Sequence, residues 1–197
     1  MDITTRIARR VRELRDAEGF TLDALAERSG VSRSNISLIE RGQSSPTAAV
    51  LDKLAAGLGV TLASLFEDDA PPAAEPSPMA RVAEQPVWTD PASGYVRRNL
   101  SPAARSPIQL VDVVFPAGQR VAYESPAREV EIHQQVWMIE GVMEVSVGQE
   151  QWRLETGDCL AMRLDLDRPI VYRNPTRKPA RYLVALATLP FNPTRRT

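Results

Sequence analysis

Residues 21–60 read TLDALAERSGVSRSNISLIERGQSSPTAAVLDKLAAGLGV, and they carry the strongest structural signal in the chain. Apolar residues recur there every three or four positions, which is typical of helices that bury one face. The breaks have local causes, because Gly30 permits a tight turn and Ser32 and Thr47 can cap the helices that follow them. The stretch therefore predicts short helices joined by tight turns.

The same periodicity continues on both sides of this stretch and predicts that residues 1–66 form an all-α domain of five short helices. Residues 22–41 have the spacing of a helix-turn-helix, with the small Ala26 where two helices approach each other closely. Residues 6–66 as a whole resemble the lambda-repressor/Cro-like (XRE) family of DNA-binding domains. The resemblance implies a sequence-specific reader of double-stranded DNA, and a protein-interaction module is the alternative.

In that family the second helix of the pair, here residues 32–40, lies in the major groove. The resemblance places the base readers on this helix: Arg33, Ser34 and Leu38. The guanidinium of Arg33 can address guanine O6 and N7 together. Many members carry Gln at the position of Leu22, so that contact is lost here or taken over by Thr21. Phosphate contacts are expected from the hydroxyl, amide and guanidinium side chains nearby: Thr21, Ser32, Asn35, Arg41 and Arg15.

The composition is that of an ordinary globular chain, and it limits which disulfides, metal sites and catalytic triads the chain can form. The chain has 197 residues, with 24 Lys and Arg against 25 Asp and Glu, one Cys and one His. This length favours two modest domains. A single Cys forms no internal disulfide, and the first twenty residues carry charges throughout in place of the apolar run of an export signal, so a cytoplasmic protein without membrane insertion is expected. A multi-histidine metal site is excluded, and a Ser-His-Asp triad would have to use His133.

Proline-rich sequence after the helical part predicts a linker over residues 67–87. The remainder, residues 88–197, changes to short runs rich in Val, Ile, Tyr and Trp, bounded by Gly, Pro and Asn. Regularly spaced runs of this kind favour an antiparallel sandwich or a small barrel. The expected strands are 108–115, 119–124, 130–139, 142–147, 151–154, 159–163, 169–173 and 180–188.

Residues 129–174 read EVEIHQQVWMIEGVMEVSVGQEQWRLETGDCLAMRLDLDRPIVYRN and follow the two cupin motifs in order. On these motifs, residues 108–188 resemble the cupin family. The resemblance implies an all-β small barrel, the double-stranded β-helix, whose interior holds a metal or a small molecule. The chain is therefore expected to have two domains, a helix-turn-helix domain followed by a cupin-like barrel.

The usual metal ligands of that family are two His and a Glu from the first motif and a His from the second. Here Gln134 stands at the Glu position, and either Ile170 or Arg168 stands at the second-motif His. His133 lies next to the ligand position, and neighbouring residues of a strand point to opposite faces. The sequence therefore predicts a barrel without the family's metal site.

A barrel without those ligands is suited to hold a small molecule among apolar walls and a few polar groups. The candidate ligand-binding residues are those expected on the inward face: Gln134, Val136, Met138, Ile170, Tyr172, Tyr123, Met162 and Tyr182. Most of the apolar members also suit an ordinary core. His133, Gln135 and Trp137 are expected to face the other way, toward a partner subunit.

The two halves together resemble bacterial transcription regulators in which an XRE-like reader is joined to a cupin-like sensor. We expect a homodimer that binds a DNA operator and a small-molecule effector, without a metal, a cofactor or catalytic activity. A homodimer follows because a reader of a few base pairs needs two half-sites one helical turn apart. Two alternatives stay open: a metal-dependent enzyme that uses ligands such as Glu129, Glu131 and His133, or a filled barrel that serves only dimerisation.

Overall fold

The computed structural model describes residues 2–66, 77–104, 106–124, 131–164 and 168–189. Its first part is helical, as the periodicity predicts, but the last of the five expected helices is a short 3-10 helix. The helices are α1 (Ile3–Ala17), α2 (Leu22–Ser29), α3 (Arg33–Glu40), α4 (Ala48–Gly57) and η1 (Ala63–Phe66).

The helix boundaries have the local causes that the sequence indicates. The side chains of Thr21, Ser32 and Thr47 accept hydrogen bonds from backbone amides in the first turns of α2, α3 and α4. Gly30 ends α2 in the left-handed conformation, with a φ of 68° that other residues adopt at a cost. The turn between α2 and α3 is therefore fixed by residues that the sequence alone identifies.

The second part is built from two antiparallel sheets. Six strands in the order β1-β2-β3-β10-β5-β8 form the larger sheet, and four in the order β4-β9-β6-β7 form the smaller one. The strands are β1 (Val87–Thr89), β2 (Val96–Asn99), β3 (Ile108–Phe115), β4 (Arg120–Tyr123), β5 (Glu131–Glu140), β6 (Val142–Val147), β7 (Glu150–Glu155), β8 (Cys159–Arg163), β9 (Ile170–Arg173) and β10 (Ala180–Leu189).

All eight strands expected from the sequence are present within one residue of their predicted ends. Two further strands, β1 and β2, were not predicted; they precede the others and pair with each other along the edge of the larger sheet. Residues 77–86 contain turns but no helix or strand, and residues 67–76 of the predicted linker lie outside the described residues. No helix in the described ranges is long and apolar enough to cross a membrane.

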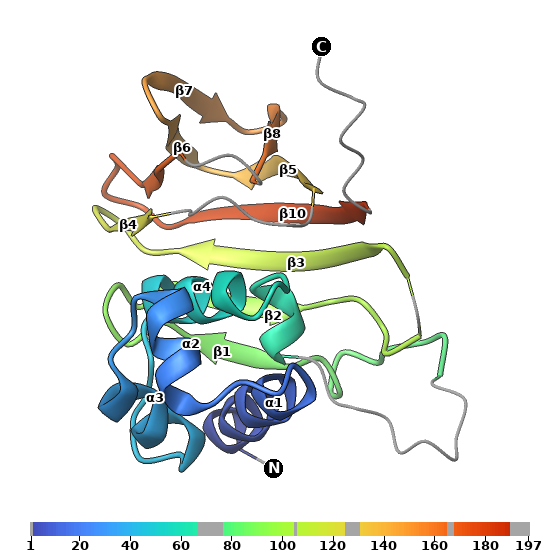
Figure 1. The fold of residues 1–197 in the computed structure, drawn as a ribbon. Helices are drawn as coiled ribbons and strands as arrows, with labels where there is room; N and C mark the ends of the chain where they lie inside the picture. Colours follow the sequence, from blue (N-terminus) through green and yellow to red (C-terminus); the bar gives the residue numbers. More distant parts are fainter. Residues whose placement is uncertain (1, 67–76, 105, 125–130, 165–167, 190–197) are drawn as a thin grey trace.

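The helical part packs directly against the β structure, with α4 on the side that faces the strands (Figure 1). Asp90, which follows β1, is buried and accepts a hydrogen bond from the backbone amide of Ala48 at the start of α4 (3.0 Å). Thr61 donates to the side-chain oxygen of Gln109 on β3 (2.8 Å). These buried polar contacts fix the position of the helical part on the sheets.

An aromatic series extends this packing into the interior of the β domain. Each ring lies 5.5–6.4 Å from the next, within the usual range of aromatic pairs. The series begins at the end of η1 and finishes between the two sheets: Phe66, Trp88, Tyr95, Phe115, Tyr182, Tyr172 and Tyr123. The two parts of the chain therefore share one continuous core.

Candidate functional site

The helix expected to read DNA, α3, has one buried and one exposed face. Ile36 and Ile39 are almost fully buried against the other helices. The opposite face is open to solvent and carries the residues expected to meet bases: Arg33, Ser34 and Leu38. Leu38 is 38% exposed, which is unusual for a large apolar side chain and suits contact with an apolar base edge such as a thymine methyl.

The side chains around the start of α3 leave polar groups available. The Ser32 hydroxyl accepts from the amide of Asn35 (3.3 Å), so it caps the helix, and it also shares a hydrogen bond with the hydroxyl of Ser34 (3.3 Å) at the exposed helix start. Arg33 forms an ion pair with Asp23 of α2 (3.2 Å), but both side chains are mostly exposed. Exposed pairs of this kind contribute only about 0–1 kcal/mol, so the guanidinium is readily redirected to a base.

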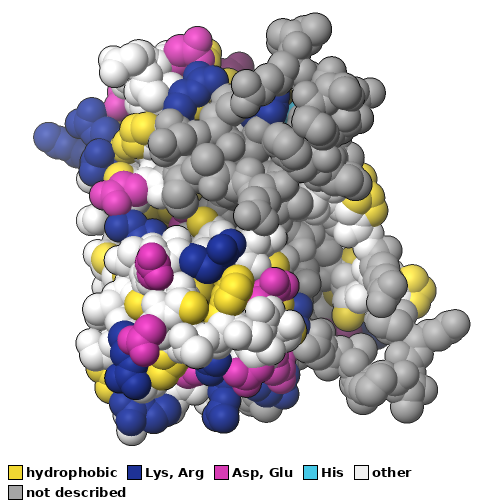
Figure 2. Space-filling view, in the orientation of Figure 1, with side chains coloured by type: hydrophobic (Ala, Val, Ile, Leu, Met, Phe, Trp, Pro, Cys, Tyr) yellow, Lys and Arg dark blue, Asp and Glu magenta, His cyan; other side chains and the backbone are white. Residues whose placement is uncertain are grey.

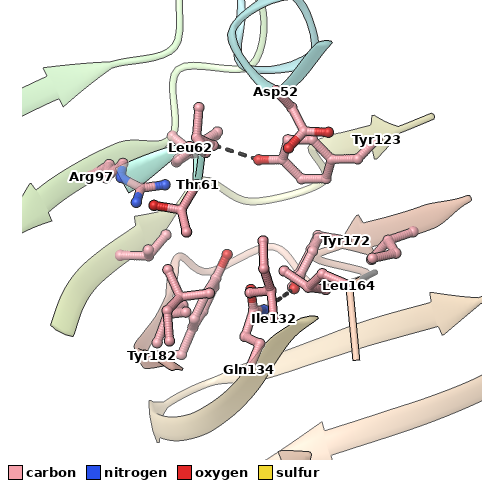
Figure 3. Close-up of a pocket in the computed structure, with 15 residues that line it drawn as sticks. Asp52, Thr61, Leu62, Arg97, Tyr123, Ile132, Gln134, Leu164, Tyr172 and Tyr182 are labelled. Carbon is pink, nitrogen blue, oxygen red and sulfur yellow. Dashed lines mark hydrogen bonds between the residues drawn. The ribbon is translucent and has the colours of Figure 1, made fainter. Parts of the chain in front are cut away.

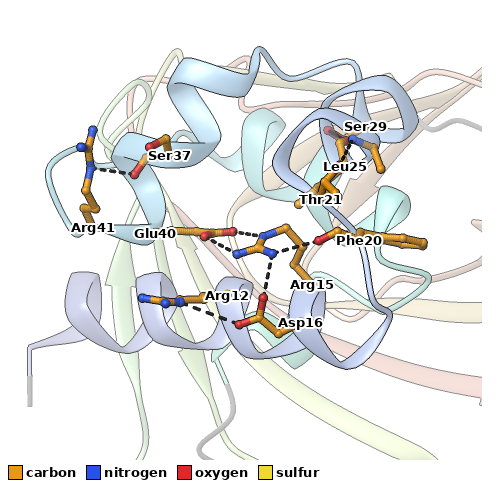
Figure 4. Close-up of polar contacts among 11 residues, drawn as sticks. Arg12, Arg15, Asp16, Phe20, Thr21, Leu25, Ser29, Ser37, Glu40 and Arg41 are labelled. Carbon is orange, nitrogen blue, oxygen red and sulfur yellow. Dashed lines mark hydrogen bonds and ion pairs between the residues drawn. The ribbon is translucent and has the colours of Figure 1, made fainter.

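Arg15, expected to reach a phosphate, is engaged inside the helical domain (Figure 4). Its guanidinium pairs with both oxygens of Glu40 at the end of α3 (2.6 and 2.8 Å) and donates to the carbonyl oxygen of Phe20 (2.9 Å). Arg15 and Glu40 have only 12% and 8% of their side chains exposed, and the hydrogen bond to Glu40 raises the pKa of Arg15. Arg15 therefore joins α1 to α3 through Glu40, and its expected phosphate contact stays a prediction.

Arg41, in contrast, is exposed at the end of α3 and donates to the carbonyl oxygen of Ser37 (3.1 Å; Figure 4). On the face drawn in Figure 2, basic and acidic side chains are interspersed over the lower, helical part and form no patch of one sign. On this face, Arg33 and Arg41 at the two ends of α3, rather than a patch of one sign, are therefore the features that suit DNA contact.

The second site is a cavity between the two sheets of the β domain (Figure 3). The centre of a water molecule can occupy about 80 Å³ of this cavity. A single water needs about 10–15 Å³ when volume is defined in this way, so the cavity can hold a small metabolite. One side of it is closed by residues of the helical part: Asp52 of α4, and Thr61 and Leu62 between α4 and η1.

Five of the eight side chains expected to bind a ligand line this cavity: Gln134, Ile170, Tyr172, Tyr123 and Tyr182. Val136 and Met138 lie on the inward face as expected, but they are fully buried in the core and do not line the cavity. Met162 is also absent from the lining and lies behind Tyr172, whose hydroxyl donates to its sulfur (3.8 Å). These three residues are packing residues in the structure.

The polar groups of the cavity wall form hydrogen bonds with one another. The amide nitrogen of Gln134 donates to the hydroxyl of Tyr172 (2.5 Å), and the hydroxyls of Tyr95 and Tyr123 lie 3.2 Å apart. Burial raises the pKa of each cavity tyrosine above its ordinary value, strongly for Tyr123, Tyr172 and Tyr182, so these hydroxyls are protonated at neutral pH and well above it. They can donate and accept hydrogen bonds but carry no charge.

The residues at the family's ligand positions do not fit a metal ion. Gln134 presents an amide engaged with Tyr172, and Ile170 presents a hydrocarbon side chain. Among the described residues no three His, Cys, Asp or Glu side chains gather where they could hold a metal. Of the alternative ligand set, Glu129 and the side chain of Glu131 lie outside the described residues.

Several cavity residues were not predicted. Arg97 and Tyr95 lie on or beside β2, a strand that sequence reasoning missed, although the run Tyr95-Val96 after a Gly is a recognisable strand start. The helical contribution of Asp52 and Thr61 carries no sequence signal, because it depends on how two parts of the chain pack. The remaining unpredicted residues are apolar: Leu62, Val113, Ile132, Leu164, Val184 and Leu186.

Comparisons with known proteins agree with this arrangement. Residues 11–65 match the helix-turn-helix family HTH_3. The chain is 27% identical over 167 residues to the HTH-type transcriptional regulator SutR of Escherichia coli K12, which covers 83% of this chain and 84% of that protein. It is 42% identical over 62 residues to the HTH-type transcriptional regulator SlrR of Bacillus subtilis, covering 31% of this chain and 41% of that protein.

A solved structure has the same fold over nearly the whole chain. The crystal structure of an HTH_3 family transcriptional regulator from Vibrio cholerae superposes with a TM-score of 0.73 at 25% sequence identity. The match covers 94% of this chain and 96% of that one. The similarity therefore includes both the helical part and the β domain.

Proposed function

We propose that this chain, which carries an XRE-type helix-turn-helix domain and has transcriptional regulators as relatives, is a regulator controlled by a small molecule bound between its sheets. The observation that carries the proposal is the composition of the cavity wall. Residues of the helical domain, Asp52 and Thr61 among them, close a cavity that is otherwise made by the β domain. A bound effector would touch both domains at once.

The contacts between the domains explain how binding would reach the DNA-reading helix. Thr61 lies in the cavity wall and is also hydrogen-bonded to Gln109 on β3. Asp52 belongs to α4, which packs against α2 of the helix-turn-helix. A ligand that shifts α4 is therefore expected to shift α2 and, with it, the other helix of the helix-turn-helix, α3.

The energetics set one condition on this mechanism. An effector changes operator affinity only to the extent that it binds the two arrangements of the domains with different affinity. A cavity wall shared by both domains meets this condition, because any change in their relative position changes the wall. The proposed activity requires no metal, no other cofactor and no chemical step.

For DNA contact we propose residues around α3 that are exposed or, in the case of Asn35, half-buried. Arg33, Ser34 and Leu38 would read bases, and Thr21, Ser32, Asn35 and Arg41 would contact phosphates. The exposed start of α3 adds the positive end of a helix whose first turn contains no acidic residue. Arg15 would join the phosphate contacts only through the part of its guanidinium that Glu40, Asp16 and Phe20 leave unused.

The function is tested by selecting binding sites for the full-length protein from random duplex DNA. We expect a palindromic operator whose half-sites lie one helical turn apart. Metabolite fractions that raise the melting temperature of the protein should then change its operator affinity about fivefold or more, a common size for coupling between two sites. Binding without sequence preference would refute the DNA-reading role, and bound metabolites that all leave operator affinity unchanged would refute the effector role.

Two half-sites require two readers, and the outer face of the larger sheet suits a second copy of the chain. Along β5 the side chains alternate, so that Gln134 and Val136 point inward while Gln135 and Trp137 point outward. Trp137 is 49% exposed, and Val114 and Ile108 of β3 are exposed on the same outer face. We propose this face as the dimer interface.

Trp137→Glu is therefore expected to raise the dissociation constant of the dimer by about tenfold or more, because a buried aromatic residue at an interface centre often dominates binding. Sedimentation velocity over a range of protein concentrations measures this change. Val82→Glu is the matched control, since Val82 is 67% exposed outside the sheets. Equal association of the two variants would assign the dimer to another surface.

A further inference from the structure

Arg97 on β2 is the most unusual side chain of the cavity. It lines the cavity and is only 7% exposed, yet its Nη2 atom has no hydrogen-bond partner among the described residues. Its Nε donates to the side-chain oxygen of Asn99 (3.3 Å), and its guanidinium lies over the ring of Phe66, 5.1 Å from the centroid. A buried guanidinium is seldom left with an unused donor, because desolvation without a partner is costly.

The cavity wall also contains a carboxylate. Asp52 of α4 is 8% exposed, and Figure 3 shows it on a different side of the cavity from Arg97, with Thr61 and Leu62 labelled between them. Neutral hydroxyl and amide groups of tyrosines and Gln134 supply the remaining polar wall. A simple anion would suit Arg97 but would be repelled by Asp52, and a simple cation would meet the reverse problem.

We propose that the cavity binds a small zwitterion of the amino-acid type, with its carboxylate on Arg97 and its ammonium group at Asp52. This inference rests on the proposed function, because it names the class of effector for the same cavity. Arg97 suits a carboxylate because its buried Nη2 lacks a partner among the described residues, and a hydrogen bond between a guanidinium and a carboxylate is stronger than one between neutral groups. A zwitterion places its carboxylate against Arg97 and its ammonium group against Asp52, so each of these side chains faces a group of opposite charge.

The proposal also explains the position of the site between the domains. Arg97 belongs to the β domain and stacks on Phe66 of η1, whereas Asp52 belongs to the helical domain. The two ends of one small molecule would then hold one domain each. A ligand of this class links the domains more directly than an apolar ligand enclosed by the sheets alone.

The experiment uses the full-length protein and each of the twenty L-amino acids as probes, with melting temperature as the first readout and calorimetry as the second. We expect at least one amino acid to raise the melting temperature. Its N-acetyl derivative keeps only the carboxylate and its methyl ester keeps only the ammonium group. Both should bind about tenfold more weakly or worse.

The side chains are tested with Arg97→Lys and Asp52→Asn, and each variant is expected to bind the amino acid about tenfold more weakly or worse. Arg98→Lys is the matched control, because Arg98 alternates with Arg97 on β2 and lies outside the cavity lining. The N-acetyl and methyl ester derivatives of the amino acid test the same contacts on the unchanged protein, so the inference stays testable if a variant fails to fold.

The outcomes separate the two proposals. The zwitterion site is refuted if no amino acid binds, if the N-acetyl derivative binds as tightly as its parent, or if Arg97→Lys leaves affinity unchanged. If metabolites of another class bind the cavity and change operator affinity, the effector function stands and only the zwitterion is wrong. If an amino acid binds through Arg97 and Asp52 but leaves operator affinity unchanged, the site stands and the effector function fails.

Discussion

Arg15→Ala is expected to lower the free energy of unfolding by about 3 kcal/mol, the lower end of the range for breaking a buried ion pair by removal of one partner. The variant leaves the Glu40 carboxylate, 8% exposed, without the guanidinium that binds both of its oxygens. It also leaves the carbonyl oxygen of Phe20 without its donor. Urea denaturation of the full-length protein measures the change.

Arg12→Ala is the matched control for this prediction. Arg12 lies on the same helix and pairs with Asp16, but its side chain is 67% exposed and the N to O distance is 3.8 Å. We expect a change within about 0.5 kcal/mol, as for most exposed pairs. A stable Arg15→Ala protein that nevertheless lost DNA affinity would restore Arg15 to the phosphate contacts and contradict the structural role.

The order of the elements was predictable because each depends on neighbours in the sequence. Thr21, Ser32 and Gly30 fix helix ends through bonds to residues a few positions away, so the pattern alone identifies them. The inward positions of β5 follow from alternation, which correctly separates Gln134 from Trp137. The short strands β1 and β2 carry a weaker pattern, because β2 contains the charged pair Arg97-Arg98.

The candidate sites were predictable only where a family pattern or strand alternation applies. Gln134 and Tyr172 follow from alternation and the cupin motifs, and they meet in the cavity. The pairing of Arg15 with Glu40 was not predicted, because an arginine on a helix surface gives the same sequence signal whether it faces solvent or a carboxylate from another helix. Asp52 enters the cavity only because the helical domain packs on the sheets, which no local pattern encodes.

Arg33→Ala is expected to weaken operator binding by about 1–3 kcal/mol, which corresponds to about 5- to 150-fold in affinity, and to relax the preference for one base pair. The reason is the exposed position of its guanidinium on α3, where the pair with Asp23 is between two mostly exposed side chains and is therefore weak. Fluorescence anisotropy on the selected operator and on its single-base variants measures both effects. Asp23→Asn, which frees Arg33, should leave base preference unchanged and bind slightly more tightly.

Arg41→Ala distinguishes base reading from phosphate contact. If Arg41 contacts phosphate, its loss weakens all sequences similarly and reduces the slope of log affinity against log salt by about one. Arg33→Lys keeps the charge of Arg33 but loses the paired donors, so it should retain the salt slope and still lose base preference. If Arg33→Ala instead changed only the salt slope, Arg33 would be a phosphate contact and sequence reading would have to come from Ser34, Leu38 and the shape of the DNA.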